Sequence, residues 1–147
     1  MKLLIATDGS EFSRAAIEHV TGFVPNSADT EIKVISVYET LRPVTGDPFG
    51  ATTQYYLEAE NASRKIAEDA VTDALDLIRA KFPDMKFTVS TSVESGRAAR
   101  MIVEAAEQWN ADMIVLGSYG YGFWERNFMG SVSDAVVHQA PCSVLVV

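Results

Sequence analysis

The stretch that decides the fold is residues 113–147, MIVLGSYGYGFWERNFMGSVSDAVVHQAPCSVLVV. It opens with an apolar run, Met113–Leu116, that leads directly into closely spaced glycines, and it closes with a second apolar run, Ser143–Val147. Between them, Ser131–Gln139 has the composition of a short helix that begins after Gly130. A strand, a loop, a helix and a second strand form the unit from which parallel sheets are built, because parallel strands need a crossover connection.

The same alternation extends back to the N-terminus. The apolar patterns predict three further strands and three further helices: strands at Leu3–Thr7, Ile32–Tyr38 and Phe87–Val93, and helices starting at Glu11, over Gln54–Phe82 and over Arg97–Trp109. The order βαβαβαβαβ predicts the α/β class, with an open, doubly wound, parallel five-stranded sheet and helices on both faces. The length of 147 residues predicts a single domain over residues 1–147. Residues 40–53, with two prolines and two glycines, are predicted to form a long loop.

Composition excludes several function classes. A net charge of −8 would repel nucleic acid and anionic membranes, so we expect neither as a partner. No apolar run reaches the roughly 18 residues that a membrane span needs, and the start of the chain is too polar for a secretory signal. One cysteine, Cys142, cannot form an internal disulfide, which favours a reducing compartment. We therefore expect a cytoplasmic protein.

The glycines after Met113–Leu116 predict a phosphate-binding loop, although the best-known loops do not fit. A Walker A loop needs a lysine before its Ser/Thr, and a dinucleotide fingerprint needs three glycines after the first strand. What remains is the spacing Gly117-x2-Gly120-x9-Gly130-Ser131. Free N–H groups at the helix that starts here attract phosphate, and the Ser131 and Ser133 hydroxyls could add donors. A glycine-rich turn followed by an ordinary N-cap serine remains the alternative.

This spacing resembles the ATP-binding motif of the universal stress protein family. The resemblance covers the whole chain and is carried by three further segments: LLIATDGSEFS, ESGRAARMIVEAAEQWNADMIVLGSYG and GSVSDAVVHQAPCSVLVV. It implies a sheet with strand order 3-2-1-4-5. It also implies a homodimer in which Ser143–Val147 pairs antiparallel with its copy. The residues support the same pairing, since this strand is apolar, lacks the lysines and prolines that protect an edge, and is naturally covered by a symmetry-related copy.

The resemblance also implies which residues hold the nucleotide. Adenine is expected near the ends of the first two strands, at Thr7, Asp8 and Val37. Ribose and phosphates are expected along the loop, at Leu116, Gly117, Gly120, Gly130, Ser131, Val132 and Ser133. Asp8 could accept hydrogen bonds from the ribose or adenine, or help to hold a divalent ion.

The loop departs from the family pattern around its second glycine. Nucleotide-binding relatives commonly carry basic residues there, whereas this chain has Tyr119 and Tyr121, with Arg126 as the only cation before Gly130. Tyrosines can hydrogen-bond phosphate but do not neutralise its charge. We therefore expect weaker triphosphate binding, a stronger need for Mg²⁺ or Mn²⁺, or a preference for AMP or ADP. Tyr119 and Arg126 complete the candidate site.

No catalytic residue is predicted. His19, His138 and Cys142 do not form a nucleophile–base arrangement, and neither histidine follows a strand. The leading hypothesis is a dimeric stress-response sensor or signalling module that binds an adenine nucleotide. Two alternatives stay open: slow ATP hydrolysis at the same site, and a dimeric interaction protein of the same fold that does not bind nucleotide.

Overall fold

The computed structural model describes residues 1–40, 53–118 and 129–147. Strands and helices alternate along it as β1 (Lys2–Ala6), α1 (Glu11–Thr21), β2 (Glu31–Tyr38), α2 (Thr53–Lys81), β3 (Thr88–Ser95), α3 (Ala98–Trp109), β4 (Met113–Leu116), α4 (Ser131–Gln139) and β5 (Ser143–Val146). All predicted bounds agree within two residues, and those of β4 and α4 agree to the residue. Most of the predicted long loop lies in 41–52, outside the described residues.

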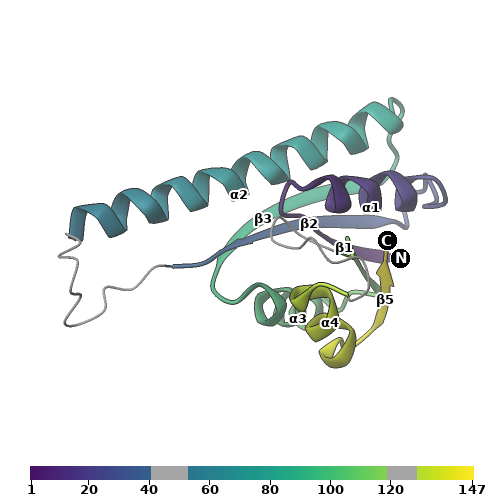
Figure 1. Cartoon of the computed structure of the whole chain (residues 1–147). Coiled ribbons are helices and arrows are strands. Elements are labelled where there is room, and N and C mark those ends of the chain that lie inside the picture. The colour runs from purple at the N-terminus through teal and green to yellow at the C-terminus, as the bar shows by residue number, and fades with distance from the viewer. Residues whose placement is uncertain (41–52, 119–128) are drawn as a thin grey trace.

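The five strands form one parallel sheet in the order β3-β2-β1-β4-β5, which confirms the predicted fold class. The chain winds outward from β1 to β2 and β3, and then crosses back to place β4 on the other side of β1 (Figure 1). The winding therefore reverses between β1 and β4, and ligands of open α/β sheets bind outside the carboxyl ends of strands at such a point. The same order makes β5 an edge strand, as predicted.

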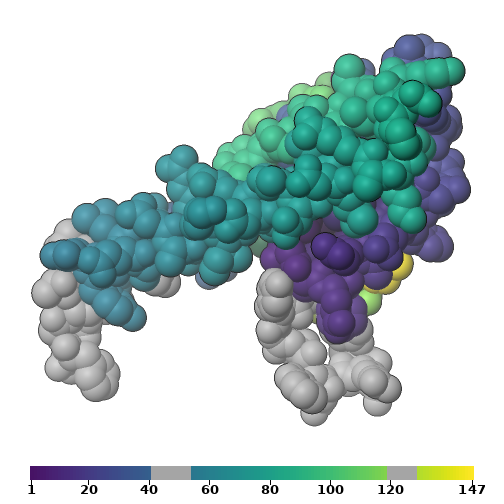
Figure 2. Space-filling model, turned by 90° about the horizontal axis from the view of Figure 1, so that it is seen from above, coloured from purple at the N-terminus to yellow at the C-terminus, as the bar shows by residue number. Residues whose placement is uncertain are grey.

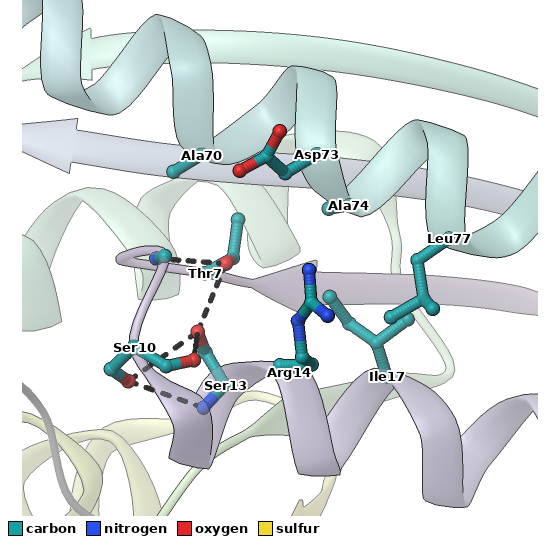
Figure 3. A pocket seen from close by; sticks show the side chains of 10 residues that line it. Thr7, Ser10, Ser13, Arg14, Ile17, Ala70, Asp73, Ala74 and Leu77 are labelled. Carbon is teal, nitrogen blue, oxygen red and sulfur yellow. Dashed lines mark hydrogen bonds between the residues drawn. The ribbon is translucent and has the colours of Figure 1, made fainter.

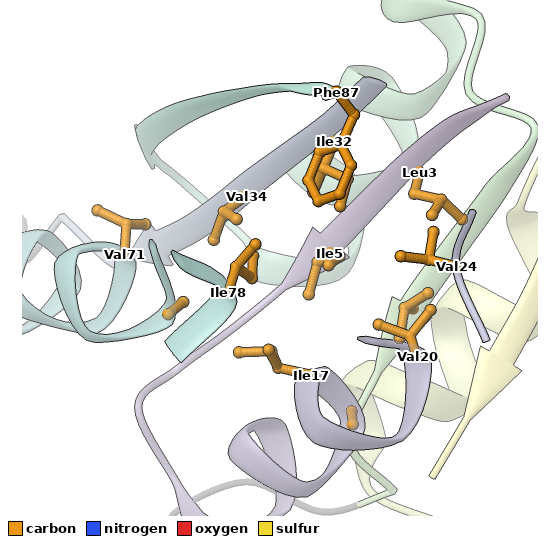
Figure 4. Close-up of a cluster of buried hydrophobic side chains, with 13 residues drawn as sticks. Leu3, Ile5, Ile17, Val20, Val24, Ile32, Val34, Val71, Ile78 and Phe87 are labelled. Carbon is orange, nitrogen blue, oxygen red and sulfur yellow. The ribbon is translucent and has the colours of Figure 1, made fainter. Parts of the chain in front are cut away.

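Two apolar layers hold the helices onto the sheet. Alternate residues of β1 point to opposite faces, so that Leu3 and Ile5 belong to one buried cluster and Leu4 and Ala6 to the other. The first cluster packs beneath α1 and α2 (Figure 4), and the second packs beneath α3 and α4. Figure 1 shows these helix pairs on opposite faces of the sheet. β1, at the centre, is buried along almost its whole length.

The buried face of α1 differs from the apolar pattern. The apolar periodicity that starts at Glu11 predicts a buried face of Phe12, Ala15, Ala16, Val20 and Phe23. Ala16 and Val20 are buried as predicted, whereas Ala15 is exposed and the Phe23 side chain is 53% exposed. The helix instead turns two small hydroxyl residues, Ser13 and Thr21, toward the core. Their hydroxyls donate to the backbone carbonyls of Ser10 and Glu18, at 3.0 and 2.9 Å, so burial leaves neither hydroxyl unsatisfied. Small side chains at these positions bring α1 close to the sheet.

Within residues 1–40, 53–118 and 129–147, no helix combines the length and apolar character that crossing a membrane requires.

The orientation of α4 can be tested with two adjacent valines. Val136 is fully buried and Val137 is 42% exposed. We expect Val136→Ala to lower the free energy of unfolding by about 2 kcal/mol, because it removes buried methyl groups and leaves a cavity. Val137→Ala, the matched control, should change it by less than about 0.5 kcal/mol. Urea denaturation followed by circular dichroism measures both, and equal effects would mean that α4 is rotated from the position described.

Candidate functional site

The turn after β1 is held by its own side chains. The Asp8 carboxylate accepts the Ser10 backbone N–H at 3.0 Å, and Gly9 takes a left-handed conformation with φ of 79°. Ser10 then caps α1, because its hydroxyl accepts the Ser13 N–H at 3.3 Å. The turn is thereby fixed at the carboxyl end of β1, with Asp8 half-buried beside the point where the winding reverses.

Thr7 faces α1 and α2. Its side chain is 7% exposed, and its hydroxyl donates to the Ser13 hydroxyl at 3.1 Å and accepts the Gly9 N–H at 3.2 Å. Figure 3 shows it beside a small hollow between α1 and α2, with Arg14 and Asp73 at the rim. Val37 packs against the opposite apolar cluster, beneath α3 and α4. The structure therefore does not bring the side chains of Thr7 and Val37, both expected near adenine, together on one face of the sheet.

Gly117 lies directly against the first turn of α1. A Cβ at this position would stand 2.7 Å from the Phe12 carbonyl carbon and 2.8 Å from the Ser13 backbone nitrogen. No side chain fits at such distances, so glycine is required for the chain leaving β4 to pass over α1. The glycine that looked like part of a phosphate loop thus has a packing role, which joins the segment after β4 to the turn after β1.

The residues on the two sides of the loop are joined by hydrogen bonds. We call this junction of Ser118 with Gly130 and Ser133 the neck. The carbonyl oxygen of Ser118 accepts the Gly130 N–H at 2.8 Å and the Ser133 hydroxyl at 3.0 Å. The Ser133 hydroxyl also lies 2.8 Å from the Gly130 carbonyl oxygen, and the residue is 2% exposed. The structure therefore gives the Ser133 hydroxyl a role in closing the neck, and its predicted contact with phosphate stays a prediction. On the strand side, the Ser118 N–H donates to the Val147 carbonyl at 2.7 Å.

The N-terminus of α4 is open. Gly130 is the N-cap and has no side chain to accept the N–H groups of the first turn, and no side-chain cap is found among the described residues. Ser131 is exposed, and Val132 is 37% exposed. The N–H groups of this turn and the positive end of the helix dipole are of the kind that can bind an anion, and phosphate binding at Ser131 and Val132 stays a prediction.

The remaining predicted residues divide into two groups. Leu116 is 4% exposed and packs in the second apolar cluster, so only its backbone could reach a ligand. Tyr119, Gly120 and Arg126 lie outside the described residues. Ser118, whose carbonyl oxygen accepts both hydrogen bonds of the neck, is not among the predicted residues. A serine after a structural glycine carries no distinct signal, because the group that acts is its backbone.

The chemically suggestive side chains lie away from this edge of the sheet. His19 and His138 occupy the last turns of α1 and α4, whereas the loops of the candidate site adjoin the first turns. Cys142 is half-buried beside the second cluster, and burial raises the pKa of its thiol. No group of three metal-ligating side chains occurs within the described ranges. The arrangement suits binding of an anion by backbone groups.

Comparison with known proteins gives consistent matches. The model of the universal stress protein family matches residues 1–147. Universal stress protein MJ0531 of Methanocaldococcus jannaschii is 31% identical over 146 residues, which cover 99% of this chain and 81% of that protein.

Solved structures share the fold. The structure of MJ0577, a universal stress protein of Methanocaldococcus jannaschii, has a TM-score of 0.77 and 27% identity, with 99% of this chain and 94% of that chain covered. A universal stress protein in complex with cAMP has a TM-score of 0.68 and 22% identity, covering 100% and 96%. A family protein from Arabidopsis thaliana with AMP bound has a TM-score of 0.66 and 14% identity, covering 100% and 90%.

The packing role of Gly117 can be tested by adding one methyl group. We expect Gly117→Ala to lower the free energy of unfolding by about 3 kcal/mol, because its Cβ would overlap the backbone of α1, which cannot move aside locally. Gly22→Ala, at the C-cap of α1, is the matched control, since Gly22 has a right-handed φ of −71°. That change should stay within about 1 kcal/mol. Equal midpoints in urea for the two variants would contradict the close contact.

Proposed function

The chain belongs to the universal stress protein family, and from this membership we propose that it binds an adenine nucleotide where the sheet reverses between β1 and β4. In this proposal it acts as a dimeric stress-response sensor or signalling module. The observation that carries the proposal is the open N-terminus of α4, which the neck of Ser118, Gly130 and Ser133 holds beside the sheet. Such a helix end binds phosphate through backbone N–H groups without a lysine.

The residues divide the work as follows. The N–H groups of Ser131 and Val132, with the Ser131 hydroxyl, bind phosphate, while Gly130 leaves room for the anion. Asp8 accepts hydrogen bonds from the ribose or base, since its carboxylate is half-exposed at the end of β1. Thr7, Val37, Leu116 and Gly117 shape the site through their backbone, and Tyr119, Gly120 and Arg126 contribute from the loop.

The charge around the site favours a nucleotide with few negative charges. The candidate residues contain one cation, Arg126, while the whole chain has a net charge of −8. Two solved members of the fold, with cAMP and with AMP, hold such ligands, which supports AMP or ADP over free ATP. For ATP, Mg²⁺ or Mn²⁺ would screen the phosphates. Asp8 fits as a single additional ligand, because one carboxylate oxygen already accepts the Ser10 N–H, and the nucleotide itself would supply the other ligands.

We propose binding without turnover. Phosphoryl transfer to water needs a group that orients the water and cations that stabilise the transferring phosphoryl. His19 and His138 lie at the far ends of their helices, and Arg126 is the only cation among the candidate residues. Slow ATP hydrolysis is therefore the weaker alternative.

We further propose a homodimer through β5. This strand lies at the edge of the sheet, and its apolar residues Val144, Leu145 and Val146 are only half-buried. Antiparallel pairing with a second β5 would satisfy the outward backbone groups and cover these side chains. A cytoplasmic location is part of the same proposal, since the one cysteine is a free thiol.

Ser131→Asp separates binding from stability. The new carboxylate would repel phosphate at the open end of α4, yet it would interact favourably with the helix dipole. We therefore expect AMP and Mg-ADP binding to weaken by about tenfold or more, with an unchanged or slightly higher midpoint of thermal unfolding. Isothermal titration calorimetry measures the first quantity and thermal denaturation the second.

Ser131→Ala is the uncharged control: it removes the hydroxyl donor but keeps the backbone donors, so its affinity should fall clearly less than that of Ser131→Asp. The proposal is abandoned if no adenine nucleotide produces heat at millimolar concentration, or if Ser131→Asp binds as well as Ser131→Ala.

Pairing through β5 can be read from hydrogen exchange. The Val147 N–H donates to Leu116 of β4 at 3.1 Å, so the N–H groups of Val144 and Val146 point away from the sheet. In a β5-paired dimer these two amides should exchange at least about tenfold more slowly at high than at low protein concentration. Exchange of the Leu145 amide, which points toward β4, serves as the internal control. Rapid exchange of Val144 and Val146 at every concentration would exclude this dimer.

A further inference from the structure

The longest helix of the protein extends well beyond the sheet that it covers. With 29 residues, α2 is about 43 Å long, whereas the eight residues of β2 span about 26 Å. Figures 1 and 2 show its N-terminal half projecting away from the body of the molecule. None of residues 54–66, which we call the overhang, is buried, and the next residue, Ala67, is buried.

This overhang carries apolar side chains that face solvent. Tyr55 is 59% exposed, Leu57 is 57% exposed and Ile66 is 61% exposed. A helix of this length without buried side chains is only marginally stable in water, since most helical stability comes from packing of an apolar face. The overhang therefore has the composition of a segment that packs against something further.

Part of the overhang forms a narrow stripe with coiled-coil spacing. Tyr55, Ala59, Ala62 and Ile66 follow one another at intervals of four, three and four residues, which places them on one side of the helix. Ala62 is exposed and Ala59 is half-buried. Alanines in the middle of such a stripe allow a second helix to approach closely.

The stripe continues the side of α2 that α1 covers. Asp73, two turns after Ile66, lines the hollow between α1 and α2 together with Ala70 (Figure 3). Because α1 begins at Glu11, beside the rim of this hollow, it leaves the part of the stripe before Ile66 uncovered. A second helix can lie there without displacing α1.

The stripe is complementary to itself in the antiparallel direction. If two copies pair about an axis between Glu60 and Asn61, each Tyr55 lies opposite the partner's Ile66, and each Ala59 lies opposite the partner's Ala62. The flanking positions next to the stripe on one side are Glu58 and Lys65, which stand seven residues apart. In the same register each Glu58 faces the partner's Lys65, so that two opposite-charge pairs form around one two-fold axis.

We propose that residues 54–66 of α2 form an interface with a second copy of this chain, as an antiparallel helix pair. This interface is separate from β5, so a chain that uses both would assemble beyond a dimer. Lys65 already contacts Asp69 within its own helix, but both side chains are more than half exposed. An exposed ion pair contributes little free energy, so Lys65 can leave Asp69, or contact it as well, when it pairs with Glu58 of the partner subunit.

Charge reversal tests this register. We expect Lys65→Glu to weaken self-association by about tenfold, because both Glu58–Lys65 pairs become repulsive. Sedimentation velocity between about 5 µM and about 500 µM measures the change in mass average, whether or not β5 also pairs. Arg64→Glu is the matched control: it breaks the exposed Arg64–Glu68 pair of the same helix, but position 64 lies opposite the stripe. It should associate like the unmodified chain.

The double variant Glu58→Lys/Lys65→Glu restores both pairs with their signs exchanged, and we expect it to regain the association that Lys65→Glu loses. Circular dichroism verifies that the helix content of each variant is unchanged. The proposal is overturned if Lys65→Glu and Arg64→Glu sediment alike, if the double variant fails to recover, or if residues 54–66 mediate association only with a different protein.

Discussion

The arrangement of this site depends on one close approach between two pieces of backbone. Gly117, the first residue after β4, lies against Phe12 and Ser13 at the start of α1, at distances that exclude any side chain. This contact joins the segments that leave β1 and β4, the two strands between which the winding reverses. A constraint of this kind explains the glycine without a ligand. It also explains why a ligand site can form here, since both walls are held by the scaffold.

The starts of α1 and α4 differ in how their backbone N–H groups are capped. α1 is capped from within, because the Ser10 hydroxyl accepts the Ser13 N–H. α4 has Gly130 as its N-cap, and the Ser133 hydroxyl in its first turn donates to the Ser118 carbonyl. The result is one helix end whose donors are partly satisfied and another whose first turn has no side-chain cap within residues 1–40, 53–118 and 129–147. The phosphate site that we propose would use these backbone N–H groups, which need no lysine in the loop.

Sequence patterns predicted the fold more completely than the site. The alternation of apolar runs gave the order of all elements, because each strand and helix of a doubly wound sheet carries its own periodicity. The strand order came from the family resemblance, and the structure confirms it. The patterns did not reveal that Gly117 packs on α1 or that Ser133 closes the neck. Both roles depend on contacts between segments distant in sequence, and a glycine or serine looks the same in either role. The prediction for the buried face of α1 was partly wrong for a related reason. Ser13 can be buried because its hydroxyl donates to the nearby Ser10 carbonyl, and a pattern of apolar residues does not reveal such a hydrogen bond.

The side of α2 that carries apolar residues changes along the helix, and this change supports a second interface. In the second half, the buried positions form one face of the helix, and three of them belong to the apolar cluster on the sheet: Ala67, Ala70, Val71, Ala74 and Ile78 are buried, and Val71, Ala74 and Ile78 are in the cluster. In the first half, the stripe of Tyr55, Ala59, Ala62 and Ile66 is rotated from that face by about a quarter of a turn. A helix that merely extended its core face would keep one phase along its length. Two phases in one continuous helix indicate two different surfaces to be covered, and the sheet of the same chain covers only one of them.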